Sequence, residues 1–224
     1  MQGSKVAHDF AQRECTVHAS LNHANIVKLY GYTETSTDYV LVMEYAGENC
    51  DYLSRKVLRD LSPIKSESLL KLWSTQLLSA LAYLHDRGII HQDIKLENVL
   101  LRHPDKSATS TEYEPAEIKL IDFGLCSVIA DPSTQMSFME QKVGTEKYQA
   151  PEVASGAWIS SAIDVWAFGV LLYELAVGYK PQTLENLVNV NYYQPNKGCV
   201  KMPFFQKDWA KREPQLLDLV SRCL

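Results

Sequence analysis

The chain has 224 residues with a formal net charge of −5, and 46% of its residues are hydrophobic. This acidic balance argues against a nucleic-acid-binding surface, which needs clustered Lys and Arg, while the apolar content is sufficient for a sizeable core. The longest apolar run, 162–177, is too short to span a membrane. The five cysteines are scattered without a C-x-x-C pair, so neither a zinc site nor a redox motif is indicated. Scattered reduced thiols are typical of a cytoplasmic protein.

The first part of the chain predicts a helix, a strand pair and a second helix. Residues 5–20 are weakly amphipathic at helical spacing. Two apolar runs, 26–32 and 39–45, flank the polar spacer T-E-T-S-T-D and predict antiparallel strands. The clearest amphipathic helix covers 66–87, where Ser66 can cap the start and Gly88 can end the helix.

The second part of the chain predicts mostly helices and loops. The segment 102–116 is rich in Ser, Thr, Pro and charge, which indicates an exposed insertion. Residues 118–125 predict a short strand that runs into a turn, and 126–160 predict a long loop. A buried helix over 161–177 and a short helix near 213–223 complete the pattern. Strands early and helices late predict an α+β fold with a small mixed lobe on a larger helical lobe.

Three short motifs follow one another along the chain: H-Q-D-I-K-L-E-N at 91–98, D-F-G at 122–124 and A-P-E at 150–152. The segments L-N-H-A-N-I-V at 21–27 and D-V-W-A-F-G at 164–169 belong to the same pattern. One tripeptide alone is a weak signal, but this set in this order is specific. The chain therefore resembles the eukaryotic protein-kinase catalytic domain over nearly its whole length. The resemblance implies a two-lobed α+β fold and an ATP-dependent phosphotransferase.

The resemblance also implies a catalytic set, Asp93, Lys95 and Asn98. Phosphoryl transfer needs mostly positioning and charge neutralisation from the protein. Asp93 would orient the substrate hydroxyl or accept its proton, and Lys95 would neutralise the transferring phosphoryl group. Asn98 and Asp122 would hold Mg²⁺ through oxygen atoms, and through this ion Asp122 also belongs to the ATP-binding set. Taken alone, each residue has a plainer interpretation as a solvated loop carboxylate, a surface lysine or a turn-forming asparagine.

The remaining nucleotide-binding residues are likewise implied by the resemblance. Glu14 matches the helix glutamate that pairs with the ATP-binding lysine of kinases. Met43, Glu44 and Ala46 resemble the hinge against which adenine stacks, and Leu100 would form an apolar floor. The implied cofactors are ATP and Mg²⁺, and the implied partner is a protein substrate.

Other motif residues are implied to be structural. His91 and Phe123 would pack, and Asp164 would bind the backbone of the catalytic loop, because an unpaired charge in an apolar helix is costly. Lys95, two residues after Asp93, is typical of serine/threonine kinases. Thr145 would contact the catalytic loop and help to select an aliphatic hydroxyl.

Three features depart from the family pattern. None of the ten glycines forms a G-x-G-x-x-G motif, and no V-A-x-K strand precedes Glu14. We therefore expect residues 1–46 to be a remnant of the small lobe and hinge, and 47–224 to be a large lobe truncated at its C-terminal end. His18 stands where kinases usually place an apolar packing residue, which predicts either a loosened helix or a histidine whose polar edge is satisfied.

Gln92 replaces the arginine of H-R-D, whose charged fork normally grips a phosphate on the activation loop. The replacement predicts an activity that depends little on phosphorylation of Ser133, Thr134 or Ser137.

Two functions remain open from the sequence. The intact catalytic set predicts a serine/threonine kinase, although the chain alone is expected to be inactive. The missing glycine-rich loop and lysine instead suit a pseudokinase or scaffold that binds partners without phosphoryl transfer.

Overall fold

The computed structural model describes residues 2–35, 38–46, 67–102, 117–129, 136–138, 144–155, 158–177 and 212–224. Ser66, the segment 103–116, Ser133 and Thr134, for which the sequence makes predictions, lie outside the described residues.

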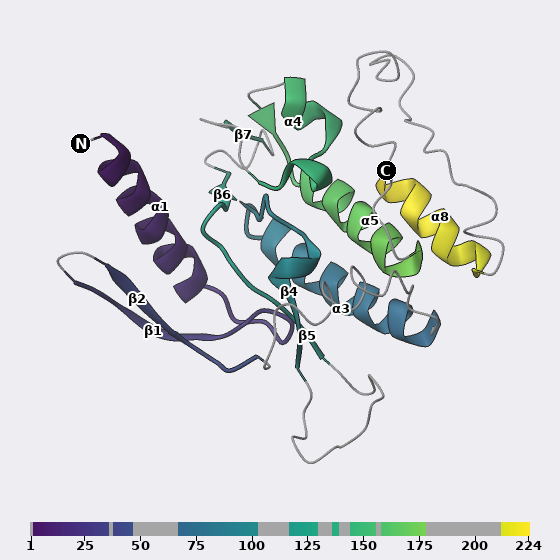
Figure 1. Ribbon diagram of the computed structural model, residues 1–224, viewed down its shortest axis with the longest axis horizontal. Coiled ribbons are helices and arrows are strands. Elements are labelled where there is room, and N and C mark those ends of the chain that lie inside the picture. The colour runs from purple at the N-terminus through teal and green to yellow at the C-terminus, as the bar shows by residue number, and fades with distance from the viewer. Residues whose placement is uncertain are drawn as a thin grey trace.

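The N-terminal part is a helix that lies along a two-stranded sheet (Figure 1). Its elements are α1 (Gln2–Ala19), β1 (Leu29–Glu34) and β2 (Tyr39–Met43). The strands are antiparallel, with Leu29 opposite Met43 and Glu34 opposite Tyr39, which confirms the predicted pair. His8 ties α1 to both strands, because its Nε2 lies 3.1 Å from Glu34 Oε1 and 3.0 Å from Tyr39 Oη.

A layer of three helices forms the larger part: α3 (Glu67–His85), α5 (Ala162–Val177) and α8 (Pro214–Cys223). In Figure 1, α5 lies between α3 and α8. The apolar positions of α3 recur every three or four residues and are buried, including Leu70, Leu77 and Leu84. Burying one such side chain contributes roughly 1.5–3 kcal/mol. Gly169 lets α8 come close, because a Cβ there would lie 2.7 Å from Cys223 Cβ.

Short strands and one 3-10 turn connect the helices and flank the two motif loops at 91–98 and 122–124. They are β3 (Ile89–Ile90), η1 (Leu96–Asn98), β4 (Val99–Arg102), β5 (Glu117–Leu120) and β6 (Ser127–Val128). The strands pair antiparallel as β3 with β6 and β4 with β5. No described helix is long and apolar enough to cross a membrane.

The long loop predicted for 126–160 is wrong in part, because this stretch contains several short elements. Besides β6 they are β7 (Ser137–Phe138), η2 (Glu146–Tyr148), α4 (Pro151–Ser155) and β8 (Trp158–Ile159). The strands pair with each other or with β3, which lies far away in the sequence. A two-residue strand has no readable period of its own, so local patterning could not predict it.

The segment after α1 joins the N-terminal part to the helical part. Val27 N donates to Leu120 O at 3.0 Å, and Leu120 N donates to Asn25 O at 2.8 Å. Asn25 Nδ2 also donates to Ile118 O at 3.1 Å. These bonds attach the chain just before β1 to β5, the strand that leads into the D-F-G turn.

Candidate active site

The backbone of the loop between β3 and β4 is held in place by a buried carboxylate on α5. Asp164 is 1% exposed, and it accepts hydrogen bonds from His91 N at 2.8 Å and Gln92 N at 2.9 Å. His85 Nε2, at the end of α3, lies 2.9 Å from the same carboxylate. The predicted contact of Asp164 with the loop backbone is confirmed. His85 was not predicted, although a histidine in the last turn of a helix that leads into this loop was a usable signal.

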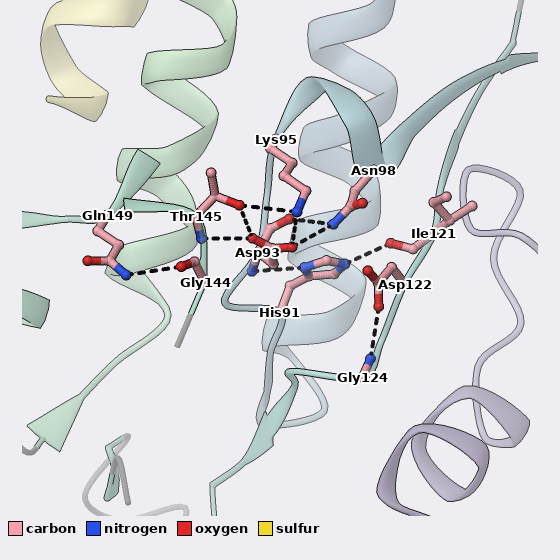
Figure 2. A network of polar contacts seen from close by, with 10 residues as sticks. All are labelled: His91, Asp93, Lys95, Asn98, Ile121, Asp122, Gly124, Gly144, Thr145 and Gln149. Carbon is pink, nitrogen blue, oxygen red and sulfur yellow. Dashed lines mark hydrogen bonds and ion pairs between the residues drawn. The ribbon is translucent and has the colours of Figure 1, made fainter. Parts of the chain in front are cut away.

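Asp93 is the centre of a polar network (Figure 2). Its Oδ2 accepts from Lys95 Nζ at 2.5 Å, and its Oδ1 accepts from Thr145 N at 3.0 Å and Thr145 Oγ1 at 2.8 Å. Lys95 Nζ also donates to Thr145 Oγ1 at 3.1 Å. Thr145 lies 52 residues after Asp93 in the sequence, and the fold brings the two side chains into contact.

The carboxyl of Asp93 is held in its ionised form. Burial alone would raise its pKa, but hydrogen bonds from Lys95 and Thr145 outweigh that effect and leave the pKa below the ordinary value. The side chain is therefore a fixed, charged hydrogen-bond acceptor with a cation directly beside it.

Asn98 and Asp122 offer oxygen atoms at the end of the β4–β5 hairpin. Asn98 Nδ2 donates to Asp93 O at 2.9 Å and to Asp93 Oδ2 at 3.0 Å, and Asn98 Oδ1 has no donor among the described residues. Ile121 N donates to Asn98 O at 3.0 Å, which ties the D-F-G turn to the asparagine. An ionised carboxylate and an amide oxygen are hard ligands that suit Mg²⁺.

The turn at Asp122 has a left-handed backbone, with φ of 68°. The side chain is exposed, and its Oδ1 accepts from Gly124 N at 3.3 Å. A Cβ on Gly124 would lie 3.4 Å from both Asp122 Oδ1 and Glu14 Oε2, so the helix glutamate reaches this turn. Burial, and then the charge of Asp122, raise the pKa of Glu14.

Two of the four residues implied for the adenine site share one small apolar cluster. Ala46 and Leu100 are buried together with Val27. Met43 ends β2 and is 45% exposed, so it lies at the rim of the structure rather than in its core. Glu44 contacts two cations of the β4–β5 hairpin, Arg102 and Lys119.

His18 is one of two histidines whose rings contact the ring of Phe123. Its ring centroid lies 4.8 Å from that of Phe123, and the His91 ring lies 5.2 Å away on an edge-to-face contact. His18 is 1% exposed, and its Nε2 hydrogen-bonds to Val27 O at 2.7 Å. Of the two predicted outcomes, the structure therefore confirms the packed histidine with a satisfied polar edge.

We expect His18 to make stability depend on pH. Burial lowers its pKa from the usual value of 6.5, so the histidine must fold as the neutral form. Its contribution to stability is present above the unfolded pKa and is lost as pH falls toward the folded pKa. A His18→Leu variant should therefore lose less free energy of unfolding than the wild type between about pH 7.5 and 5.5. Urea titrations at several pH values measure this, and equal pH slopes for both proteins would contradict it.

Gly144 brings Thr145 against the catalytic loop. Its φ is 87°, and a Cβ at this position would collide with the carbonyl oxygen of Gln92. A Gly144→Ala variant should lose at least about 1–2 kcal/mol of stability, because the residue must adopt a left-handed backbone and move away from Gln92. Gly31→Ala is the matched control, since nothing lies within 4 Å of a Cβ there. It should change stability by less than about 1 kcal/mol in chemical denaturation. Equal effects of the two variants would contradict the close approach.

The Asp–Lys–Asn loop and the Asp-Phe-Gly turn lie side by side, joined by the hydrogen bond from Ile121 N to Asn98 O, which is the arrangement of a protein kinase catalytic domain. The model of the protein kinase domain matches residues 2–224, so the chain belongs to the protein kinase family.

The chain is similar to several curated kinases. It is 33% identical over 215 residues to the SNF1-related protein kinase catalytic subunit alpha KIN12 of Arabidopsis thaliana, covering 95% of this chain and 38% of that protein. It is 36% identical over 161 residues to mitogen-activated protein kinase kinase kinase 13 of Homo sapiens, covering 72% and 15%. It is 29% identical over 219 residues to probable serine/threonine-protein kinase 2 of Plasmodium falciparum, covering 97% and 39%. The chain thus spans less than two fifths of each of these relatives.

Proposed function

We propose that the full-length protein is a serine/threonine protein kinase that transfers the γ-phosphoryl group of ATP to hydroxyl groups of protein substrates. The observation that carries the proposal is the network around Asp93, which combines an ionised acceptor, the Lys95 cation and the Thr145 hydroxyl within hydrogen-bond distance. The names of the relatives, which are themselves protein kinases, support the same class of activity.

The geometry of Asp93 favours orientation over early proton abstraction. A carboxylate with a lowered pKa is a weak base, so its main contribution is to hold the incoming hydroxyl in line with the phosphoryl group. Lys95 then offsets charge on the transferring oxygens. Asn98 and Asp122 would hold Mg²⁺, which supplies neutralisation of the phosphate charge. Asn98 suits this role because its amide N–H groups are both used by Asp93, which leaves its oxygen for the metal.

The nucleotide would lie between the N-terminal part and the β4–β5 hairpin. Ala46 and Leu100, which share an apolar cluster, suit the two sides of an adenine ring. Met43 and Glu44 would complete the hinge. Glu14 would contribute to nucleotide binding by pairing with a phosphate-binding lysine, as the matching glutamate of the family does.

The acceptor peptide would lie over a small hollow whose lining includes Asp93, Thr145 and Gln149. Thr145 donates its hydroxyl to Asp93 and thus borders the place where the acceptor oxygen must lie. A site bordered in this way suits the short side chain of Ser or Thr better than the long ring of Tyr.

We further propose that 1–46 form part of a small lobe with its hinge, and that 47–224 belong to the large lobe. A cytoplasmic location is proposed on the free thiols of Cys15, Cys126 and Cys223.

The hydroxyl preference is tested with three matched peptides that differ only in a Ser, Thr or Tyr acceptor. Full-length protein, MgATP and each peptide are incubated, and the initial rates of phosphopeptide formation are compared. Ser and Thr peptides should be phosphorylated and the Tyr peptide should not. A Tyr peptide that reacts as fast as the others would contradict the serine/threonine assignment.

We expect activity to persist after phosphatase treatment. Gln92 donates from Nε2 to Ser127 Oγ, so the side chain that would face an activation-loop phosphate in an H-R-D kinase is engaged within the protein. The strand pairs β3–β6 and β7–β8 also hold parts of the stretch 126–160 by backbone hydrogen bonds. Kinase rates before and after phosphatase treatment should agree within about twofold, because an amide lacks the charge needed to bind phosphate tightly. A large loss of activity in the treated protein would overturn the prediction, and a mock-treated sample is the control.

A further inference from the structure

One face of the β4–β5 hairpin points at the proposed hinge. In the antiparallel register Leu100 lies opposite Lys119, and Arg102 opposite Glu117. Side chains of directly opposed residues, and of residues two apart in a strand, share one face of a sheet. Leu100, Arg102 and Lys119 therefore share a face. Leu100 packs on Ala46, and the two cations bind Glu44, two residues before Ala46.

The contact between Lys119 and Glu44 is a buried ion pair. Lys119 Nζ lies 2.8 Å from Glu44 Oε1, and the two side chains are 7% and 13% exposed. The contact therefore places a cation directly beside a buried carboxylate oxygen. Arg102 Nη1 adds a weaker contact at 3.6 Å to Oε2 and is 43% exposed. A lysine buried to this degree is costly unless it has a partner, so the pair is strongly specified.

The charge states of the groups around Lys119 are consistent with an ion pair between Lys119 and Glu44. Burial alone would raise the pKa of Glu44, but Lys119, a hydrogen bond from the backbone N–H of Lys28 and the charge of Arg102 lower it, so the carboxylate stays charged. Among the described residues, the charge of Lys119 also affects the titration of His23. Burial first, and then the charges of Lys119 and Arg87, lower the pKa of His23, so the neutral form of this neighbour, which does not repel the lysine, is favoured.

The backbone around Glu44 is fixed at the same place. Glu44 N donates to Lys28 O at 2.8 Å, directly after β2 ends at Met43. The side-chain carboxylate of Glu44 is therefore held by Lys119 of β5, while the backbone N–H of Glu44 is held by Lys28, directly before β1. Two independent attachments leave the hinge backbone at Glu44 little freedom.

The same strand β5 leads to the candidate metal ligand, because Asp122 follows Lys119 by three residues. We propose that Lys119 and Glu44 form a positioning pair that sets the hinge relative to Asp122, and thereby the fit of the adenine base while the phosphates bind the metal. This inference rests on the proposed function. The pair touches neither the phosphates nor the acceptor hydroxyl, so it should act on nucleotide binding rather than on transfer.

The test compares variants of the full-length protein. Lys119→Met should raise the KM for ATP about tenfold with kcat changed by less than about twofold, because binding is lost equally in the ground and transition states. Lys119→Arg keeps the charge and should restore most of the affinity.

The double variant Glu44→Gln with Lys119→Met leaves no unpaired buried charge, so it should fold even if Lys119→Met does not. It should show the same rise in KM. Lys71→Met, an exposed lysine on α3, is the matched control and should change neither constant.

MgADP affinity, measured by calorimetry on the same proteins, separates this inference from the proposed function. A wild type that binds MgADP but transfers no phosphate would refute the kinase proposal, and the affinities would still test the positioning pair. Unchanged KM and MgADP affinity in the folded double variant would overturn the inference, as would a loss confined to kcat. A folded wild type that binds no MgADP would overturn both.

Discussion

An Asp93→Asn variant of the full-length protein is expected to lose phosphoryl transfer by about 10²- to 10⁴-fold, the range in which a positioned carboxylate contributes to catalysis. Asn offers one weaker acceptor in place of the ionised carboxylate that now faces Lys95 and Thr145. Its amide N–H group would also point at a cation or a hydroxyl donor. The incoming hydroxyl would then lose its acceptor and its orientation. Initial rates at saturating MgATP measure the loss.

Asp86→Asn is the matched control. Asp86 is exposed directly after α3, and its replacement makes the same change of charge away from the network. The control should retain the wild-type rate. Similar affinities of wild type and Asp93→Asn for MgADP would show that the lost step is transfer. An Asp93→Asn protein that keeps its rate would refute the assignment of Asp93.

An Asp164→Ala variant is expected to show the largest loss of stability. The carboxylate is 1% exposed and accepts from two backbone N–H groups and from His85. Its removal would leave the amides of His91 and Gln92 buried without an acceptor. Each unsatisfied buried donor costs about 1–3 kcal/mol, so the loss should reach roughly 2–6 kcal/mol. Since domains of this size are stable by about 5–15 kcal/mol, the variant should unfold at markedly lower denaturant.

Asp164→Asn refines this test, because its single carbonyl oxygen can still accept from one of the two amides. Its loss of stability should lie between those of wild type and Asp164→Ala in equilibrium unfolding. If Asp164→Ala unfolded at the same denaturant concentration as the wild type, the carboxylate would not be what holds the loop.

Elements with a strong period of their own could be predicted from the sequence. The helix α3 follows its leucine spacing, and α5 is apolar on every side because it is buried on every side, including Phe168, Val170 and Leu172. The pairs β3–β6 and β7–β8 could not be predicted, since each strand has two residues and finds its partner across a long stretch of chain. Pairing of this kind depends on tertiary structure rather than on local propensity.

For the candidate site, the sequence predicts which residues take part but not how they contact one another. Asp93, Lys95, Asn98 and Asp122 stand in contiguous motifs, so their identity could be predicted from the sequence. Their mutual geometry, such as the double bond of Asn98 Nδ2 to Asp93, needed the structure.

Lys119 was missed altogether. In the sequence it is one more polar residue in an alternating strand, and a solvated lysine is the usual outcome at such a position. Only the register of β4 with β5, and the return of the chain after β2, put a carboxylate beside it. Buried ion pairs between distant segments leave no local pattern, so a contact such as Lys119–Glu44 is found in the fold alone.

The kinase proposal is tested most directly by transfer of the labelled γ-phosphate of ATP, with and without Mg²⁺, to a protein rich in Ser and Thr, by the full-length protein. Transfer that requires Mg²⁺ and yields phosphoserine or phosphothreonine is the predicted result. A folded full-length protein that binds MgATP yet transfers no label to any substrate would contradict the proposal, and it would identify a binding module that retains the catalytic residues without the reaction.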